Sequence, residues 1–152
     1  MQKIACIAAL CLAGAGIANA EAEPSTVLVT GTQAGKGTFL ELEYLGDGAA
    51  VGVQVELVFE GVDVKKVSLS GCAAPKSGAV LGTCRFRGNT LVYAKLNSNI
   101  EPLNSGTLAT IRVPASKGTF SVTPVKVVTS DASGRSSQGE LLLDMFGQVQ
   151  AK

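Results

Sequence analysis

Residues 51–60 read VGVQVELVFE, and this stretch decides the fold because its apolar side chains recur at every second position. Val53, Val55, Leu57 and Phe59 alternate with mostly polar residues, which is the pattern of a half-buried strand. Glycines stand close to both ends of the stretch and favour turns there. The stretch therefore predicts a β-strand that places one face on a core and leaves a partly polar face outside.

Further strand patterns, separated by glycine, proline and polar turn signals, lie on both sides of this stretch. They cover residues 26–33, 40–44, 62–69, 85–87, 90–96, 108–113, 119–129 (one or two strands around Pro124) and 141–149. The Ser/Gly segment 130–139 is expected to form a loop. No longer segment has apolar residues at helical spacing, and about nine short strands are typical of a sandwich or barrel. We expect an all-β domain, an antiparallel β-sandwich.

Residues 1–20 have the composition of a secretory signal peptide. The single charge of Lys3 precedes an apolar run over residues 4–17, and small residues follow up to Ala20. The run is shorter than the about 20 apolar residues that a membrane-spanning helix needs, which speaks against an uncleaved anchor. We expect cleavage after Ala20 and one domain over residues 21–152, in a secreted or periplasmic protein with no membrane association after cleavage.

Two of the four cysteines fall inside the expected signal peptide. A lipid anchor at Cys11 is the alternative there, but the bulky Leu10 stands where lipoprotein cleavage sites have a small residue. Cys72 and Cys84 remain, and an even pair with short spacing predicts a disulfide in an oxidising compartment. A redox or metal pair is the alternative, although the spacing is not C-x-x-C and the chain has no histidine.

Composition restricts the chemistry further. All 12 acidic residues and all but one of the 13 basic ones follow residue 20, so the mature segment has no formal net charge and no basic field for nucleic acid. The absence of histidine excludes Ser-His-Asp and Cys-His catalysis. Glu41 and Glu43 share a strand face about 7 Å apart, and such a pair is more typical of a solvated surface than of a glycosidase. We expect no enzyme, no cofactor and no metal site.

Aromatic residues bear on glycan binding, because sugars stack on exposed rings. The chain has no tryptophan. Alternation predicts that Tyr44, Phe59 and Phe86 point inward, whereas Tyr93 is predicted on the outer face. For Asp131 in the Ser/Gly segment, a turn held by side-chain oxygens is favoured over a calcium loop.

Three stretches resemble the cohesin domain, the receptor half of the cohesin–dockerin pair that builds cellulosomes. Residues 51–67 are similar to the strand of that family that ends in an aromatic-acid pair, followed by a turn and a further strand. Residues 89–94, NTLVYA, resemble the central apolar strand after a Gly-Asn turn. Residues 103–111, LNSGTLATI, resemble the polar turn, glycine and Leu-Ala-Thr-Ile-like strand of the family.

The resemblance implies a nine-stranded sandwich with jelly-roll topology, related to cellulose-binding modules, in which a flat sheet face docks a dockerin-like protein in a polysaccharide-related extracellular assembly. Gly52 and Gln54 stand where cellulosomal cohesins often place Asn and Asp. Strand parity, with two strands placed in one sheet by the resemblance, gives a candidate partner-binding patch of Gln54, Glu56, Tyr93, Lys95 and Asn97. The alternatives are a carbohydrate-binding module that binds a polysaccharide directly, and a self-associating structural subunit.

Overall fold

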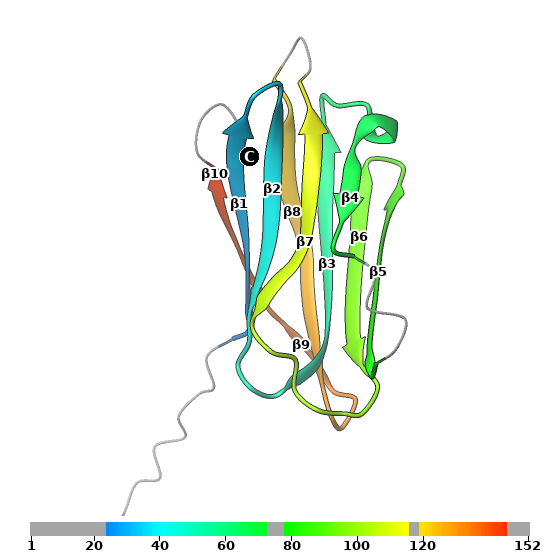
Figure 1. The fold of residues 1–152 in the computed structure, drawn as a ribbon. Helices are drawn as coiled ribbons and strands as arrows, with labels where there is room; N and C mark the ends of the chain where they lie inside the picture. The colour runs from blue at the N-terminus through cyan, green and yellow to red at the C-terminus, as the bar shows by residue number, and fades with distance from the viewer. Residues whose placement is uncertain (1–23, 73–77, 116–118, 146–152) are drawn as a thin grey trace, which may run out of the picture.

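A computed structural model describes residues 24–72, 78–115 and 119–145. The expected signal peptide and residues 146–149 of the last expected strand lie outside this part. Two five-stranded sheets pack face to face (Figure 1). The elements are β1 (Thr26–Ala34), β2 (Gly37–Leu45), β3 (Ala50–Glu60), the 3-10 turn η1 (Val64–Lys66), β4 (Ser68–Ser70), β5 (Val80–Arg87), β6 (Thr90–Asn97), β7 (Gly106–Pro114), β8 (Ser121–Asp131), β9 (Ser136–Gln138) and β10 (Glu140–Met145).

The strand order is β10-β1-β2-β7-β4 in the first sheet and β5-β6-β3-β8-β9 in the second. The described neighbours are antiparallel except β1 and β10, which run parallel. The β-sandwich expected from the sequence is confirmed, with ten strands in the described part where about nine were predicted.

Alternating side chains from both sheets fill the space between them. In β3, Val53, Val55, Leu57 and Phe59 are all buried, as the alternation predicts. They meet apolar side chains of the first sheet and of β6 and β8 in one cluster. The largest fully buried members are Tyr44, Tyr93, Phe59, Leu40, Leu42, Leu57, Leu91 and Ile111.

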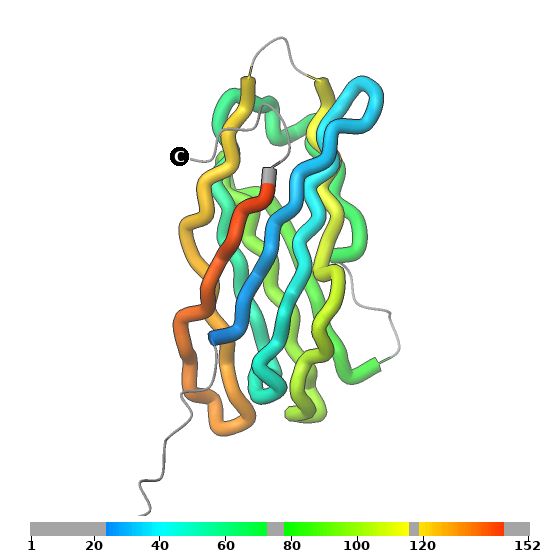
Figure 2. The backbone as a smooth tube through the Cα atoms, turned by 90° about the vertical axis from the view of Figure 1, so that its left-hand side faces the viewer, coloured from blue at the N-terminus to red at the C-terminus, as the bar shows by residue number. Residues whose placement is uncertain are grey.

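The chain passes from β9 of the second sheet to β10 of the first along the orange-to-red part of the tube in Figure 2. Gly139 is the residue between these two strands. The Gly139 amide donates to the Val127 carbonyl oxygen at 3.0 Å, and the next amide donates to the Ser25 carbonyl oxygen at 3.0 Å. A Cβ at this position would lie 2.6 Å from Val127 Cγ1 and 2.8 Å from the Ser25 oxygen. Only glycine lets the two sheets approach this closely where β10 begins.

The strand predicted over residues 62–69 is wrong in its first half. Asp63 caps η1 there, because its Oδ1 accepts from the Lys65 amide at 3.1 Å, and β4 occupies only Ser68–Ser70. The valines at 62, 64 and 67 are typical of a strand in the sequence. The side chain of Asp63, however, binds the local backbone in an Asx turn, which competes with pairing to another strand.

The segment after β8 is a short hairpin rather than a plain loop. Asp131 Oδ1 accepts from the amides of Ser133 and Arg135 at 2.9 and 3.0 Å, which closes the turn into β9. The hydroxyl of Ser133 also donates to this oxygen, at 2.6 Å, and these hydrogen bonds lower the pKa of Asp131. The predicted turn held by side-chain oxygens is confirmed, and the same oxygens allow β9 to pair with β8.

Candidate functional site

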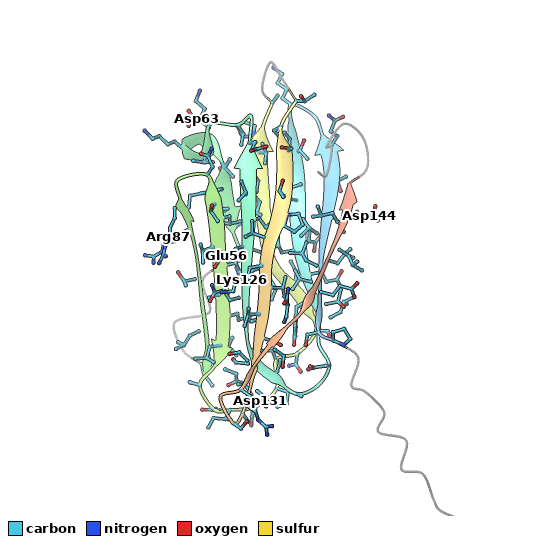
Figure 3. The ribbon with its side chains drawn as sticks, turned by 180° about the vertical axis from the view of Figure 1, so that it is seen from behind. Glu56, Asp63, Arg87, Lys126, Asp131 and Asp144 are labelled. Carbon is cyan, nitrogen blue, oxygen red and sulfur yellow. A yellow bond between two sulfur atoms is a disulfide. The ribbon has the colours of Figure 1, made fainter. Side chains whose placement is uncertain are left out.

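The outward side chains of β5, β6, β3 and β8 form a broad surface that we call the second-sheet face, seen from the front in Figure 3. Strand register places side chains of the four strands side by side in rows. From β5 to β8 the rows are Leu81–Leu96–Gly52–Ser130, Thr83–Ala94–Gln54–Val128 and Arg85–Val92–Glu56–Lys126. Within the described residues no other element covers this face.

One half of the second-sheet face carries charge. Glu56 of β3 has Lys126 of β8 as its cross-strand partner, and Arg87 projects from β5 (Figure 3). Arg85, two residues earlier on β5, is exposed on the same face. Gln54 donates a 2.7 Å hydrogen bond from Nε2 to Glu56 Oε1, so the two polar side chains of β3 are held together and half-buried. This half offers donors and acceptors in a fixed arrangement.

The other half is apolar and hollowed. One depression of about 230 Å³ lies between Leu81 and Leu96 over Ala94, and a second of about 220 Å³ lies over Gly52 beside Val128. Leu81 and Leu96 are 57% and 45% exposed, although they are apolar and neighbours across the strand pair. Paired exposed leucines beside a hollow are typical of a contact surface for another molecule.

Gly52 accounts for part of the hollow. A Cβ at this position would lie 2.5 Å from Ser130 Oγ and 3.2 Å from Leu96 Cδ1. Any side chain here would therefore displace its neighbours and fill the second depression. The sequence comparison with cohesins pointed to this position, but its role in shaping the surface could be found only from the register of three strands.

The predicted contact patch is divided between the two faces of the sheet. Gln54 and Glu56 lie on the second-sheet face, as expected. Tyr93 does not, because it stands opposite Val55 and points into the core, where only 1% of it is exposed. The prediction of an outer-face Tyr93 is wrong. β6 is apolar at both parities over residues 91–94, so alternation alone could not decide which face of it is buried.

Lys95 and Asn97 share the parity of Tyr93 and also turn away from the second-sheet face. Asn97 is 8% exposed, and its Oδ1 accepts from the Asn99 amide at 3.1 Å, so its side chain holds the turn after β6. Lys95 is half-buried near the end of the strand, at the border of both depressions. Of the five predicted residues, the structure brings only Gln54 and Glu56 together on one surface.

The two buried tyrosines have raised pKa values, but neither lies at a solvent-exposed surface. Desolvation by burial raises the pKa of Tyr93 to about 12. It also raises the pKa of Tyr44, whose hydroxyl lies 3.2 Å from Ser25 Oγ. Burial is the main cause of both shifts, so both phenols stay protonated and uncharged over the physiological pH range.

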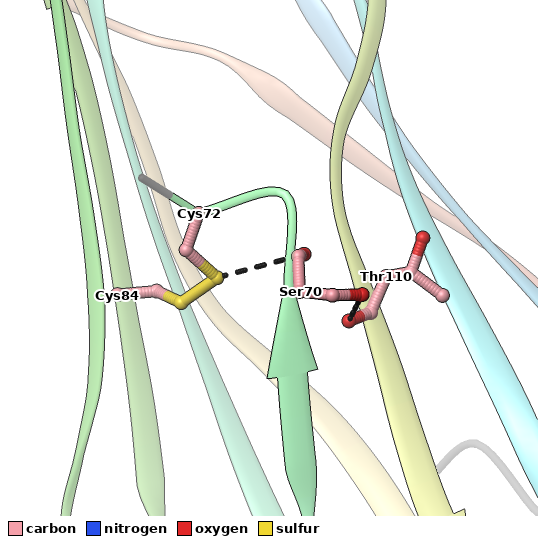
Figure 4. Close-up of a disulfide and its surroundings, with 4 residues drawn as sticks. All are labelled: Ser70, Cys72, Cys84 and Thr110. Carbon is pink, nitrogen blue, oxygen red and sulfur yellow. Dashed lines mark hydrogen bonds between the residues drawn. A yellow bond between two sulfur atoms is a disulfide. The ribbon is translucent and has the colours of Figure 1, made fainter. Parts of the chain in front are cut away.

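The Cys72–Cys84 disulfide lies at the side of the sandwich next to β5 (Figure 4). Cys72 follows β4 of the first sheet and Cys84 belongs to β5 of the second, so the bond joins the edges of both sheets. Beside it, Ser70 of β4 donates from Oγ to the Thr110 carbonyl oxygen at 3.3 Å. The predicted bridge is confirmed, and it fixes the outermost strand of the second-sheet face.

In residues 24–72, 78–115 and 119–145, no three cysteine, aspartate or glutamate side chains gather in a way that could hold a metal ion. No helix in the described part is long and apolar enough to cross a membrane. The second-sheet face combines a hydrogen-bonded charged half with an apolar hollow, which suits reversible binding of another molecule.

Solved structures with a similar fold include cohesin modules. A type I cohesin–dockerin complex from Clostridium thermocellum aligns with a TM-score of 0.56 at 15% identity, covering 82% of this chain and 96% of that one. The domain has a cohesin-like fold. A type II cohesin–X–dockerin complex from Acetivibrio cellulolyticus gives 0.54 at 12% identity, covering 84% and 99%. A non-cellulosomal cohesin from Archaeoglobus fulgidus gives 0.54 at 14%, covering 82% and 93%.

No family model matches the sequence, and no curated protein matches it. The similarity to cohesins therefore lies in the fold, at low sequence identity, and the resemblance stated from residues 51–67, 89–94 and 103–111 agrees with it. These stretches form β3 with the following turn and η1, the first part of β6, and the end of the loop before β7 with the first part of that strand.

Proposed function

We propose that this chain is a secreted, non-catalytic binding module that docks a dockerin-like protein partner on its second-sheet face. The observation that carries the proposal is the uncovered pair of depressions beside a hydrogen-bonded charged row, on a cohesin-like sandwich. Two of the similar structures are cohesins solved in complexes with dockerins. Cleavage after Ala20 and an extracellular or periplasmic site are part of the same proposal.

The proposed contact set replaces the inward-facing members of the sequence-based patch. It keeps Gln54 and Glu56 as the polar centre and adds Leu81, Ala94 and Leu96 as the apolar part. The exposed leucine pair and the depressions beside it suit an apolar helix face, because helices lie readily along shallow apolar grooves. Arg85 and Lys126 flank the centre and set the charge that a partner must match.

Direct glycan binding has less support from the surface. The described aromatic residues Tyr44, Phe59 and Tyr93 are buried, and Phe39, Phe86 and Phe120 are half-buried. A glycan site of the stacking kind needs an exposed ring, and the described surface has none. Retardation of the protein by soluble polysaccharides in affinity electrophoresis would favour this alternative over protein docking.

The test is capture of the organism's secreted proteins on the immobilised protein, with and without calcium. Ala94→Arg places a long charged side chain between the two depressions and is expected to abolish capture. Thr30→Arg makes the same kind of change on the outer face of the first sheet and is the matched control, which should retain capture. Calcium-dependent capture would indicate a dockerin, whose fold needs that ion. Equal capture by both variants would contradict docking on the second-sheet face.

A further inference from the structure

The outer face of the first sheet is acidic. Its strands β10, β1 and β2 carry four carboxylates that point outward, and these strands contain no lysine or arginine. The neighbouring β7 adds one exposed cation to this face, Arg112, which lies over the Phe39 ring at 5.8 Å. The four are Glu140, Asp144, Glu41 and Glu43. Strand register places Asp144, Thr30 and Glu41 in one row and Leu142, Leu28 and Glu43 in the next. We call this surface the acidic face.

The second-sheet face carries more basic than acidic side chains. Arg85, Arg87 and Lys126 point outward and are exposed, against the carboxylates of Glu56 and Glu60. In the described part of the chain, the two ion pairs are Lys66–Asp63 and Arg135–Asp131, both in turns. The charges of the two broad faces are therefore not neutralised by either of these pairs.

The two faces also match in spacing and in apolar content. Glu41 and Glu43 are two residues apart on β2, and Arg85 and Arg87 are two residues apart on β5, so each pair spans about 7 Å along its strand. Next to the charges, each face has a cross-strand pair of leucines. These pairs are Leu28 with Leu142, which is 46% exposed, and Leu81 with Leu96.

We propose that the acidic face binds the second-sheet face of another copy of this chain. Opposite charges on the two sides of one thin sandwich make the contact heterologous, so that each copy uses one face and leaves the other free. Such contacts continue into an open chain of stacked domains. The proposal rests on the charges of the faces and not on the proposed docking function, although a docked partner would occupy the same second-sheet face and end the stack.

Analytical ultracentrifugation of the purified protein tests the proposal. We expect the average mass to rise with protein concentration at about 0.02 M salt and to return to that of the monomer at about 0.5 M, because screening lengths shrink to a few ångströms there. A protein that stays monomeric over the whole concentration series at low salt would overturn the proposal. Association that salt does not weaken would also overturn it.

Charge reversal identifies the surfaces. Glu41→Lys with Glu43→Lys, and separately Arg85→Glu with Arg87→Glu, should each weaken self-association at least tenfold, because the first removes the negative charge of the acidic face and the second makes both faces negative. Lys65→Glu with Lys66→Glu is the matched control in η1 and should leave association unchanged. Circular dichroism checks that each variant folds, and Lys126→Glu replaces the arginine pair if that variant does not.

Mixing the two reversed variants is the decisive step. Each monomeric variant keeps one original face, and the two original faces are complementary, so an equimolar mixture should associate again. No recovery on mixing would overturn a heterologous contact, as would unchanged association of the Glu41→Lys, Glu43→Lys variant. That variant leaves the second-sheet face intact and should still capture a docking partner, so failure of self-association is distinguishable from failure of the proposed function.

Discussion

Glu56 of β3 stands directly opposite Lys126 of β8, in the centre of the second-sheet face (Figure 3). The strand register shifts just beyond this pair, where Leu57 is opposite Pro124 and Val125 forms the bulge. Because proline has no amide hydrogen to donate to the ladder, the bulge lets β8 continue past it as one strand. The bulge thus keeps Lys126 on the outer face beside Glu56, although the strand contains a proline.

The Glu56–Lys126 pair allows the register of β3 and β8 to be tested. Glu56→Lys places two cations opposite each other and should lower the free energy of unfolding by about 0.2–1 kcal/mol. The double variant Glu56→Lys, Lys126→Glu restores opposite charges and should recover most of the loss in urea unfolding. A double variant as unstable as the sum of the two single ones would show that the side chains are not neighbours.

Burial of Tyr93 predicts a loss of stability at high pH. The pKa of its phenol is about 12 in the folded protein, compared with 10.0 for the free side chain. The unfolded state therefore ionises first, so the contribution to stability is complete below pH 10 and is lost as the pH rises to about 12. The loss amounts to about 2–3 kcal/mol by the linkage relation.

Urea unfolding between pH 8 and 12 measures this loss, with Tyr93→Phe as the control. The variant removes the titrating group and keeps the ring in the core, so its stability should fall less over the same pH interval. Part of the fall remains, because the pKa of Tyr44 is also raised by burial. Parallel curves for the two proteins would contradict the burial of Tyr93.

The fold could be predicted from the sequence because one strand face is buried almost everywhere. In the middle of β2 and β3 one parity is apolar throughout and the other is mostly polar, and the structure buries the apolar parity from Leu40 to Tyr44 and from Val53 to Phe59. The pattern failed where local side-chain hydrogen bonds decide the backbone, as at Asp63 before η1 and at Asp131 before β9. The alternation of apolar residues carries no information about such hydrogen bonds.

The candidate site was predictable only in part, for a related reason. Gln54 and Glu56 are polar residues that alternate with the apolar residues of β3, so their outward direction follows from the sequence. β6 offers Val92 and Ala94 at one parity and Leu91 and Tyr93 at the other, and both sets are apolar. Its burial is decided by pairing with β3, which a single sequence does not reveal. The acidic face likewise appears only when β10 is paired with β1.

The loop after β6 contains a residue in a costly backbone conformation. Ile100 has a φ of 62°, in the left-handed region, and is 58% exposed, so it gains little from packing. A β-branched residue in that region costs about 1–2 kcal/mol, whereas asparagine tolerates it. Ile100→Asn should therefore raise the free energy of unfolding by about 1 kcal/mol.

Ile100→Val is the matched control for this prediction, because it keeps the branched Cβ and hence the unfavourable backbone energy. Thermal unfolding of the three proteins in parallel measures the difference. An equal increase in stability for Ile100→Asn and Ile100→Val would contradict the prediction. It would mean that the gain comes from the smaller exposed apolar side chain and not from the backbone conformation.

The disulfide provides the last prediction, because it is the covalent link between the edges of the two sheets. Cys72 and Cys84 are 12 residues apart, and closing a loop of this size stabilises the folded state by about 3 kcal/mol in the chain-entropy model. Reduction should lower the urea midpoint by the equivalent of this loss. The Cys72→Ala, Cys84→Ala variant should unfold at the same urea concentration as the reduced protein, and reductant should not change its midpoint.

Amide hydrogen exchange then locates the effect within the fold. Loss of the bond should speed exchange in β5 more than in β1 and β2, because β5 is an edge strand paired only with β6. Since β5 carries Leu81 and Arg85, partner capture and self-association should both weaken on reduction, while the centre of the first sheet stays protected. Uniform acceleration in all strands would instead show that the bond stabilises the whole domain without holding β5 in particular.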